Sequence, residues 1–278
     1  MVINNKITIV TGLWDIKRHE LTEGWSRSYE EHYIDKFAKL LEIPYNLIIF
    51  GDKELEEFVF KYRKKENTQF IVRPQSWFKG EFYDKIQEIR KDEKWIKQSG
   101  WLGESTQAKL DMYNPLVMSK PYLLHDAKIL DKFDSTHLFW LDAGITNTVH
   151  LGYFTHDKVL EKLHNIDKVT FLAFPYEAEN EIHGFNYKKM CDLTLSKVDK
   201  VCRGGFFGGP VDSLSDFNNQ YYNIMKRTLN EGYMGTEESL FSILIYKHSD
   251  LYQYFLIESN GLVSKFFEDL KNDNHKVL

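Results

Sequence analysis

A single carboxylate at the end of an apolar segment is the feature of this sequence that most clearly suggests chemistry. Residues 137–142 read His-Leu-Phe-Trp-Leu-Asp, a pattern that predicts a buried strand with Asp142 at its end. An acid in such a place needs solvent, a cation or hydrogen-bond donors. A divalent cation with oxygen ligands, Mg²⁺ or Mn²⁺, is one interpretation. A cap on the following turn is the other, and the spacing favours neither.

Two adjacent acids mark the start of a predicted helix. Thr236 is a suitable N-cap for a helix whose apolar face continues through Leu240 and Leu244,. Glu237 and Glu238 then lie in the first turn, where each would stabilise the positive helix end by about 0.3–1 kcal/mol. For either acid alone, this structural function is the simpler interpretation.

A glycine-rich segment precedes this helix. Residues 203–210 read Arg-Gly-Gly-Phe-Phe-Gly-Gly-Pro, with more glycine than an ordinary strand interior or helix contains. The pattern predicts close approach of the backbone to another group, or a bulged strand with a tight turn. It has neither the P-loop nor the Rossmann glycine order, so neither an NTPase nor a dehydrogenase is indicated.

Alternating strand-like and helix-like segments must position these residues. Ser28 and Glu31 form a capping-box pattern before a helix that contains Tyr33 and Phe37,. The first strand is expected from Ile7 to Thr11. Further strands are expected at 47–50, 69–72, 137–141, 169–174 and near Val201,. A β-α-β-α order predicts an α/β fold with a mostly parallel central sheet flanked by helices, and a ligand site at the carboxyl ends of the strands.

Composition limits the class of protein. The 278 residues fit one domain, expected at 1–270, followed by a polar C-terminal tail at 271–278 that should fray,. With 36 basic and 41 acidic residues, the chain has no global positive field, and nucleic acid is an unfavoured partner. Charges interrupt each apolar run before the roughly 18 residues that a membrane helix needs. We expect a cytoplasmic protein, or one peripheral at the inner membrane.

Four segments together resemble a known family. Residues 10–16, Val-Thr-Gly-Leu-Trp-Asp-Ile, and 139–144, Phe-Trp-Leu-Asp-Ala-Gly, are similar to the bacterial HtrL/YibB-like glycosyltransferases, as are residues 203–210 and 235–240. The resemblance covers nearly the whole chain. It implies a single GT-A-like domain that transfers a sugar from a nucleoside diphosphate, often in the biosynthesis of surface glycans.

The resemblance also implies a metal site, which this sequence completes only in part. The GT-A pattern is Asp-x-Asp, whereas this chain has Asp142-Ala-Gly144. Asp142 and Gly144 are therefore expected beside the donor phosphates, with Mn²⁺ or Mg²⁺ as cofactor. The second acid is missing, and His248 is a candidate to supply the remaining metal ligand.

Donor contacts follow from the same resemblance. The loop after the first strand is where such enzymes bind the base and ribose, with UDP-sugars favoured. Gly12 would let the backbone approach the ligand, and Thr11 could hydrogen-bond the base or ribose, while Trp14 fits the core equally well. Additional candidates for the diphosphate and its surroundings are Arg18, Arg27, Arg73 and Lys120,.

Acceptor contacts are expected at the two later motifs. By resemblance, Gly204, Gly205, Gly208 and Gly209 would leave room for sugar or acceptor, with Phe206 or Phe207 as a stacking wall. Many inverting GT-A enzymes place a general base at the corresponding helix start, so Glu237 or Glu238 is the expected catalytic base, with Glu238 favoured. The segment around His183 should lie near the acceptor, with no function assigned.

Three functions remain compatible with the sequence. The first is transfer of a sugar from a nucleoside diphosphate donor to a glycan. The second is noncatalytic binding of a nucleotide or glycan by a chain that lost its second metal-binding acid. The third is glycosylation of a nonsugar acceptor, such as protein or modified nucleic acid, for which residues 61–65 would be a modest basic patch,.

Overall fold

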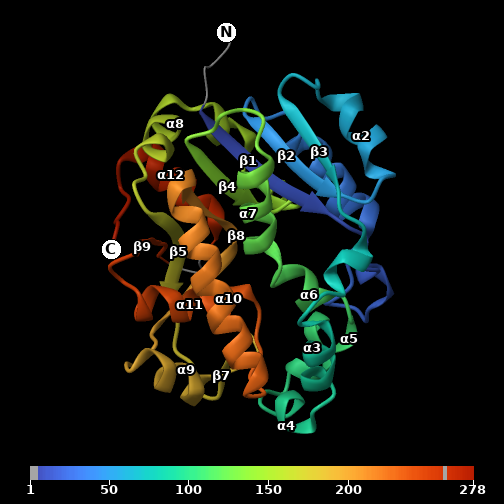
Figure 1. Ribbon diagram of the computed structural model, residues 1–278, viewed down its shortest axis with the longest axis vertical. Helices are drawn as coiled ribbons and strands as arrows, with labels where there is room; N and C mark the ends of the chain where they lie inside the picture. Colours follow the sequence, from blue (N-terminus) through green and yellow to red (C-terminus); the bar gives the residue numbers. More distant parts are fainter. Residues whose placement is uncertain (1–5, 259–261) are drawn as a thin grey trace.

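A seven-stranded sheet forms the centre of the molecule (Figure 1). The computed structural model describes residues 6–258 and 262–278. The strands, in the spatial order β3-β2-β1-β4-β8-β5-β9, are β1 (Ile7–Leu13), β2 (Asn46–Gly51), β3 (Thr68–Val72), β4 (His137–Leu141), β5 (Val169–Pro175), β8 (Lys200–Pro210) and β9 (Tyr252–Leu256). Of these seven, β8 alone is antiparallel to both neighbours. The predicted α/β class with a mostly parallel sheet is confirmed.

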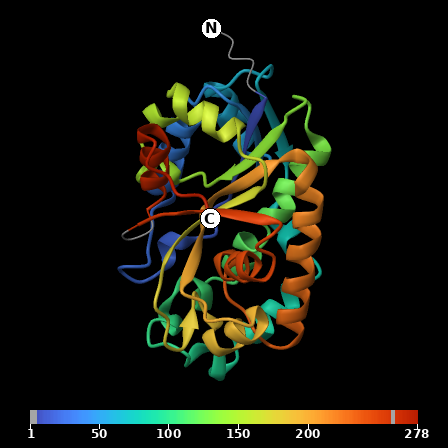
Figure 2. The same cartoon turned by 90° about the vertical axis from the view of Figure 1, so that its left-hand side faces the viewer.

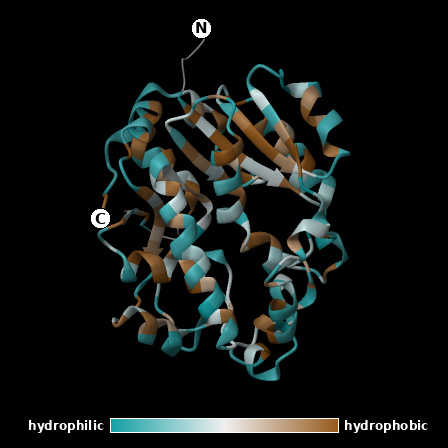
Figure 3. Ribbon diagram, in the orientation of Figure 1, coloured by the Kyte–Doolittle hydropathy of each residue, from teal (hydrophilic) through white to brown (hydrophobic). Residues whose placement is uncertain are grey.

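Helices cover both faces of this sheet. They are α1 (Asp35–Leu40), α2 (Leu55–Tyr62), α3 (Tyr83–Arg90), α4 (Glu93–Ile96), α5 (Thr106–Lys109), α6 (Tyr113–Val117), α7 (Lys120–Leu130), α8 (Asp157–His164), α9 (Tyr187–Thr194), α10 (Leu214–Asn230), α11 (Glu237–Lys247) and α12 (Val263–Asn272). Because successive strand side chains point to opposite faces, Phe139 and Trp140 belong to different hydrophobic clusters, as do Phe206 and Phe207. The sheet strands are correspondingly rich in hydrophobic residues (Figure 3).

The first strand is longer than predicted. We expected it to end at Thr11, but pairing with β2 continues through Gly12 and Leu13, which lie opposite Phe50 and Gly51. The predicted strands at 47–50, 69–72, 137–141 and 169–174 are all present. Short-range apolar patterns were sufficient for these strands; β2, β4 and β5 are buried over most of their length, whereas β3 at the sheet edge is only partly buried,.

The glycine-rich segment is the interior of strand β8. Gly208 has a φ of +143°, and a Cβ there would lie 2.2 Å from the backbone oxygen of Leu138. A Cβ on Gly209 would lie 2.6 Å from the oxygen of Lys168. The pairing with β5 shifts register between Thr170 and Leu172. The bulged-strand alternative is therefore correct, and Gly208 and Gly209 permit close packing of strands instead of binding a sugar.

The C-terminal tail continues the sheet at its edge. We expected residues 271–278 to fray, but Leu278 exchanges two backbone hydrogen bonds with Tyr254, each 3.0 Å long. Leu256 also donates its backbone N–H to the oxygen of Lys276. Figure 2 shows the C-terminus beside β9. Among the helices of the described residues, none has the length and apolar character that crossing a membrane requires.

Candidate functional site

A cavity of about 680 Å³ opens at the carboxyl ends of β1 and β4. The loops after these strands form one side, and the first residues of α7 and α11 reach it from other elements. This is the edge where a mostly parallel sheet is expected to bind ligands. Nine residues that the sequence suggested as ligand or catalytic contacts line the cavity, namely Gly12, Trp14, Arg18, Arg27, Lys120, Asp142, Gly144, Glu237 and Glu238.

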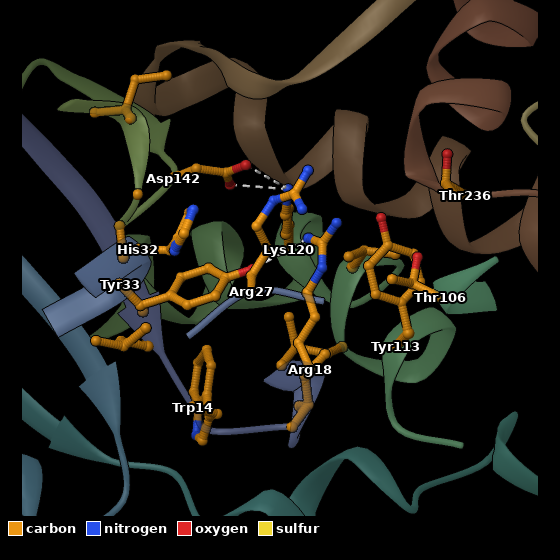
Figure 4. A pocket seen from close by; sticks show the side chains of 18 of the residues that line it. Trp14, Arg18, Arg27, His32, Tyr33, Thr106, Tyr113, Lys120, Asp142 and Thr236 are labelled. Atoms are coloured by element: carbon orange, nitrogen blue, oxygen red, sulfur yellow. Dashed lines mark hydrogen bonds and ion pairs between the residues drawn. The ribbon is translucent and has the colours of Figure 1, made fainter. Parts of the chain in front are cut away.

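The ammonium group of Lys120 connects its own helix α7 to three other elements at the cavity wall (Figure 4). Its Nζ lies 2.8 Å from Asp142 Oδ1 and 2.7 Å from Glu237 Oε1. It also donates to the backbone oxygen of Gly204 at 3.2 Å. Lys120 begins α7, Asp142 follows β4, Gly204 lies in β8, and Glu237 begins α11. One buried cation therefore holds together the groups that the sequence singled out separately.

Burial and charge set the protonation of this cluster. Desolvation raises the pKa of Glu237 to about 7; Lys120 opposes this, and the Glu238 and Asp142 carboxylates add to it. Burial lowers the pKa of Lys120, but Asp142 and Glu237 outweigh burial and raise it above its ordinary value. Lys120 is thus charged at neutral pH, while Glu237 can gain or lose a proton there.

Glycine makes room for the carboxylate of Glu237. A Cβ on Gly204 would lie 2.1 Å from Glu237 Oε1. Gly205 accepts a backbone hydrogen bond from Asp142, and a Cβ on it would lie 3.8 Å from Asp142 Oδ2. Gly204 and Gly205 therefore position the two acids and do not line the cavity.

Glu238 forms a second, partly buried ion pair with His183. The distance from His183 Nδ1 to Glu238 Oε2 is 2.5 Å, and Glu238 Oε1 accepts the backbone N–H of Gly204 at 2.8 Å. Burial by itself would raise the pKa of Glu238, but His183, Arg203 and this N–H lower it to about 2. Sequence patterns did not assign His183 a function, because its partner lies 55 positions away and only the folded chain brings the pair together.

Two guanidinium groups extend into the cavity from the loop after β1 (Figure 4). Arg18 donates to Tyr33 Oη and to the backbone oxygen of Trp25, both at 3.1 Å. Arg27 donates to the backbone oxygens of Gly24 and Ser26. Within residues 6–258 and 262–278, neither arginine is in an ion pair. Their positive charge is therefore available to an anionic ligand.

Aromatic side chains complete the cavity wall. Trp25 and Trp101 stack with ring centroids 6.0 Å apart, and Tyr33 and Tyr113 face the interior (Figure 4). None of these four was assigned to the site from the sequence. Aromatic residues in a sequence do not by themselves indicate a ligand site, because they occur in hydrophobic cores as well as on ligand-binding surfaces.

The threonine before α11 does not cap the helix with its side chain as predicted. Thr236 occupies the N-cap position but makes no side-chain capping hydrogen bond. Its Oγ1 is buried and has no hydrogen-bond partner within the described residues. Thr236 lines the cavity with other atoms, whereas its hydroxyl oxygen is buried beneath the cavity surface.

Several predicted contacts lie elsewhere. Thr11 is fully buried in β1, so it cannot reach a ligand. Arg73 is paired with Asp126 at 2.5 Å and lies over the Trp77 ring. Phe206 and Phe207 are fully buried in the two cores, so the predicted stacking wall is wrong. None of these side chains lines the cavity.

Gly12 and Trp14 border the cavity in a different way from that predicted. A Cβ on Gly12 would lie 2.4 Å from the Trp14 ring. Trp14 is 5% exposed and donates its Nε1–H to the backbone oxygen of Arg73. Gly12 thus leaves room for the Trp14 ring. Trp14 is mainly a core residue, and one edge of it borders the cavity.

The donor set does not fit a protein-bound Mn²⁺ or Mg²⁺. Asp142 Oδ1 accepts hydrogen bonds from Trp140 and Lys120, and Oδ2 accepts from Lys120. Asp142 is thus neither the expected metal ligand nor a side-chain cap. His248 follows the last residue of α11, at the end opposite Glu237, so the prediction that it completes the site is wrong. The described residues contain no group of three His, Cys, Asp or Glu placed for a metal.

The fold and this cavity define an α/β protein with a charged ligand site at the carboxyl edge of its sheet. Residues 5–267 match the model of the HtrL_YibB family, described as a bacterial protein of unknown function. The chain belongs to this family. No curated protein matches it.

Three solved structures have distant likeness to this chain. Mouse xyloside xylosyltransferase 1, in its apo form, is 8% identical over 89% of this chain and 83% of its own, with a TM-score of 0.41. Core-mannan synthase A from Aspergillus fumigatus, in its Mn/GDP form, is 9% identical over 90% and 72%, with a TM-score of 0.49. The 4-diphosphocytidyl-2C-methyl-D-erythritol synthase from Anaerococcus prevotii is 10% identical over 98% and 96%, with a TM-score of 0.42. Likeness at this level does not assign a function.

Proposed function

We propose that this protein transfers a sugar from a nucleoside diphosphate donor to an acceptor hydroxyl. The observation that carries the proposal is the cavity itself, which combines the guanidinium groups of Arg18 and Arg27, neither in an ion pair within the described residues, with ionisable groups on another wall. Diphosphate needs positive charge in two places, and guanidinium groups supply paired hydrogen bonds to phosphate oxygens. The family resemblance of the four sequence motifs favours a sugar nucleotide, with uridine as the base.

The donor is proposed to lie with its diphosphate toward Arg18 and Arg27, because the ammonium of Lys120 already donates to Asp142, Gly204 and Glu237. During transfer, the bond between the anomeric carbon and the diphosphate oxygen breaks, and that oxygen keeps the electron pair. The two guanidinium groups stabilise this developing charge because they are held in place before the reaction begins,. No step requires a metal ion, since the donor set around Asp142 is occupied by hydrogen bonds from the protein.

The acceptor is proposed to be a glycan, bound near Thr236 and the aromatic wall. Thr236 borders this part of the cavity, and the stacked pair of Trp25 and Trp101 offers an apolar face for a sugar ring,. Transfer to a glycan also fits the resemblance. We place the reaction in the cytoplasm or at the inner face of the membrane.

A panel of nucleoside diphosphate sugars tests the proposal. Each donor is assayed for hydrolysis and for binding, with and without Mn²⁺. Turnover of at least one donor is expected. Tight binding without hydrolysis or transfer to any acceptor would instead support the noncatalytic alternative, in which the chain binds a nucleotide or glycan. Absence of binding by every donor would refute the donor site.

A further inference from the structure

The turn that carries His183 is built to hold one side chain in place. His183 lies between the short strands β6 (Glu181–Ile182) and β7 (Phe185–Asn186). Its φ is +50°, a left-handed conformation that non-glycine residues seldom adopt. Such a backbone persists where its surroundings fix it, and these sites are often functional.

Three hydrogen bonds fix this turn. Glu181 accepts the backbone N–H of Gly184 at 2.7 Å. The side-chain amide of Gln107 donates to the backbone oxygen of His183 at 3.0 Å, and that of Gln98 donates to the oxygen of Gly184 at 3.1 Å. The turn is therefore attached to a separate part of the chain, which brings the imidazole to the cavity.

The imidazole has one nitrogen engaged and one available. Nδ1 is paired with Glu238, whose other oxygen is held by the N–H of Gly204. Nε2 has no hydrogen-bond partner among the residues that the structure describes. The His183 side chain is 22% exposed, so the ring is largely desolvated but still reaches the cavity.

We infer that His183 is the general base that takes the proton of the acceptor hydroxyl, and that Glu238 is its positioning residue. This inference rests on the proposed function and alters the sequence-based prediction that Glu238 itself is the base. Despite burial, the contacts of Glu238 with His183 and Gly204, together with Arg203, lower its pKa to about 2, which makes this carboxylate a weak base at neutral pH,. A histidine oriented by a carboxylate is a well-suited base near neutral pH.

The proposed step balances with groups that are present. The acceptor oxygen forms a bond to the anomeric carbon as its proton moves to Nε2 of His183. The bond from that carbon to the diphosphate oxygen breaks, and the diphosphate leaves with the electron pair. The resulting imidazolium is stabilised by the carboxylate of Glu238, to which its Nδ1–H already points.

The charges around the ring agree with this function. Burial lowers the pKa of His183, but Glu238 raises it more strongly; Arg203 opposes and Glu181 assists this rise. The ring of Tyr176 also packs edge-on against the imidazole. The net direction is a raised pKa, so His183 should lose its proton, and become able to accept one, above its ordinary range.

Two substitutions test the pair in the full-length protein, using the donor that the panel identifies. His183→Asn keeps an amide that can bond Glu238 but has no basic nitrogen. Transfer to acceptor should fall by roughly 10²–10⁴-fold, whereas affinity for the nucleoside diphosphate stays unchanged. His125→Gln, on α7 beside Ser215 and outside the cavity, is the matched control and should transfer normally.

Glu238→Gln provides a readout that a merely structural residue would not affect. Because Glu238 raises the pKa of His183, its removal should move the acidic limb of the kcat/KM profile to lower pH and also reduce kcat. Normal transfer by His183→Asn, or an acidic limb that does not move in Glu238→Gln, would overturn the inference. A wild-type chain that binds no donor would instead refute the proposed function, and the base assignment with it.

Discussion

Lys120 is the residue on which the arrangement of the site most depends. Its ammonium is surrounded by oxygens of Asp142, Glu237 and Gly204, an environment that resembles the oxygen shell of a metal ion,. Asp142 follows β4 as the sequence predicted, but the charge that it meets is a lysine from α7. Gly144 occupies the position where the Asp-x-Asp pattern would place its second acid.

Restoring that acid should create a metal site. Gly144 has φ −87° and ψ 10°, which other residues can adopt, and an added Cβ would meet Asn147 Nδ2 at 3.4 Å. Gly144→Asp is therefore expected to fold and to gain Mn²⁺-dependent affinity for a nucleoside diphosphate. Calorimetric titration with and without Mn²⁺ measures this.

Gly144→Asn is the matched control, because it has similar size without the charge. The wild-type protein and the control should bind the nucleotide equally well with Mn²⁺ or with a chelator. Chelator-sensitive binding by the wild type would show that our interpretation of the Asp142 donor set is wrong.

Glu237 should make folding stability depend on pH. Burial first, and then the neighbouring acids, raise its pKa from the ordinary 4.5 to about 7. Between these values the folded state keeps a proton that the unfolded state has lost, so this residue's contribution to stability decreases as pH rises through that window. Glu237→Gln should remove the decrease, as measured by urea unfolding at about pH 5 and about pH 8.

Glu93→Gln is the control for this measurement, since Glu93 is exposed and paired only with Lys97. It should have the same pH dependence as the wild type. If Glu237→Gln and the wild type lose stability in parallel over this range, Glu237 does not hold its proton as proposed.

At the scale of elements, local sequence patterns predicted where strands lie but did not predict which residues the strands contact. The β-branched and aromatic runs of β1, β2, β4 and β5 are short, apolar and bounded by turn residues, so they were found from the sequence,. The antiparallel β8 was recognised only near Val201, because its glycines are untypical of strands. The fold explains why glycine is needed there, because the backbones of Leu138 and Lys168 lie against Gly208 and Gly209.

The residues of the candidate site could also be predicted only in part from the sequence. Asp142, Glu237 and Glu238 stand at the ends of recognisable elements and do meet at one cavity. Their partners were not predictable, because Lys120 lies 117 positions from Glu237 and the His183 turn depends on bonds from distant glutamines. Residue identity indicates chemistry, whereas pairings of this kind depend on tertiary packing.

The C-terminal strand pairing should contribute measurably to stability. Deletion of residues 275–278 removes three backbone hydrogen bonds to β9 but keeps Asp273 and its ion pairs with Lys158 and Lys162. At about 0.5–1.5 kcal/mol for each bond, the loss should be about 3 kcal/mol. Urea unfolding measures it. Val277→Ala retains the backbone bonds and should be near wild type; equal stability of truncated and full-length chains would mean that the tail is dispensable.

At the scale of the whole molecule, the cavity places basic side chains beside acidic ones, in a chain with a net charge of −5. The guanidinium groups of Arg18 and Arg27 come from the loop after β1, whereas Lys120, Glu237 and His183 come from α7, α11 and the β6–β7 turn. A ligand that contacts both groups of elements would connect them in the folded state only. Binding should therefore stabilise the entire fold, and not merely one loop.

A nucleoside diphosphate at about 100 times its Kd should thus add about 2.7 kcal/mol to the free energy of unfolding, because a ligand bound only by the native state shifts the equilibrium by mass action. For a chain of this size the melting temperature should rise by about 5 °C or more, most with UDP.

Arg18→Gln and Arg27→Gln should each reduce this rise, since the diphosphate loses a charged donor. Arg227→Gln, which affects only a surface pair with Glu231 on α10, should leave it unchanged. Thermal melts with each nucleoside diphosphate distinguish the outcomes: no shift with any base would refute the donor site, and equal shifts in all three variants would place the diphosphate away from these arginines.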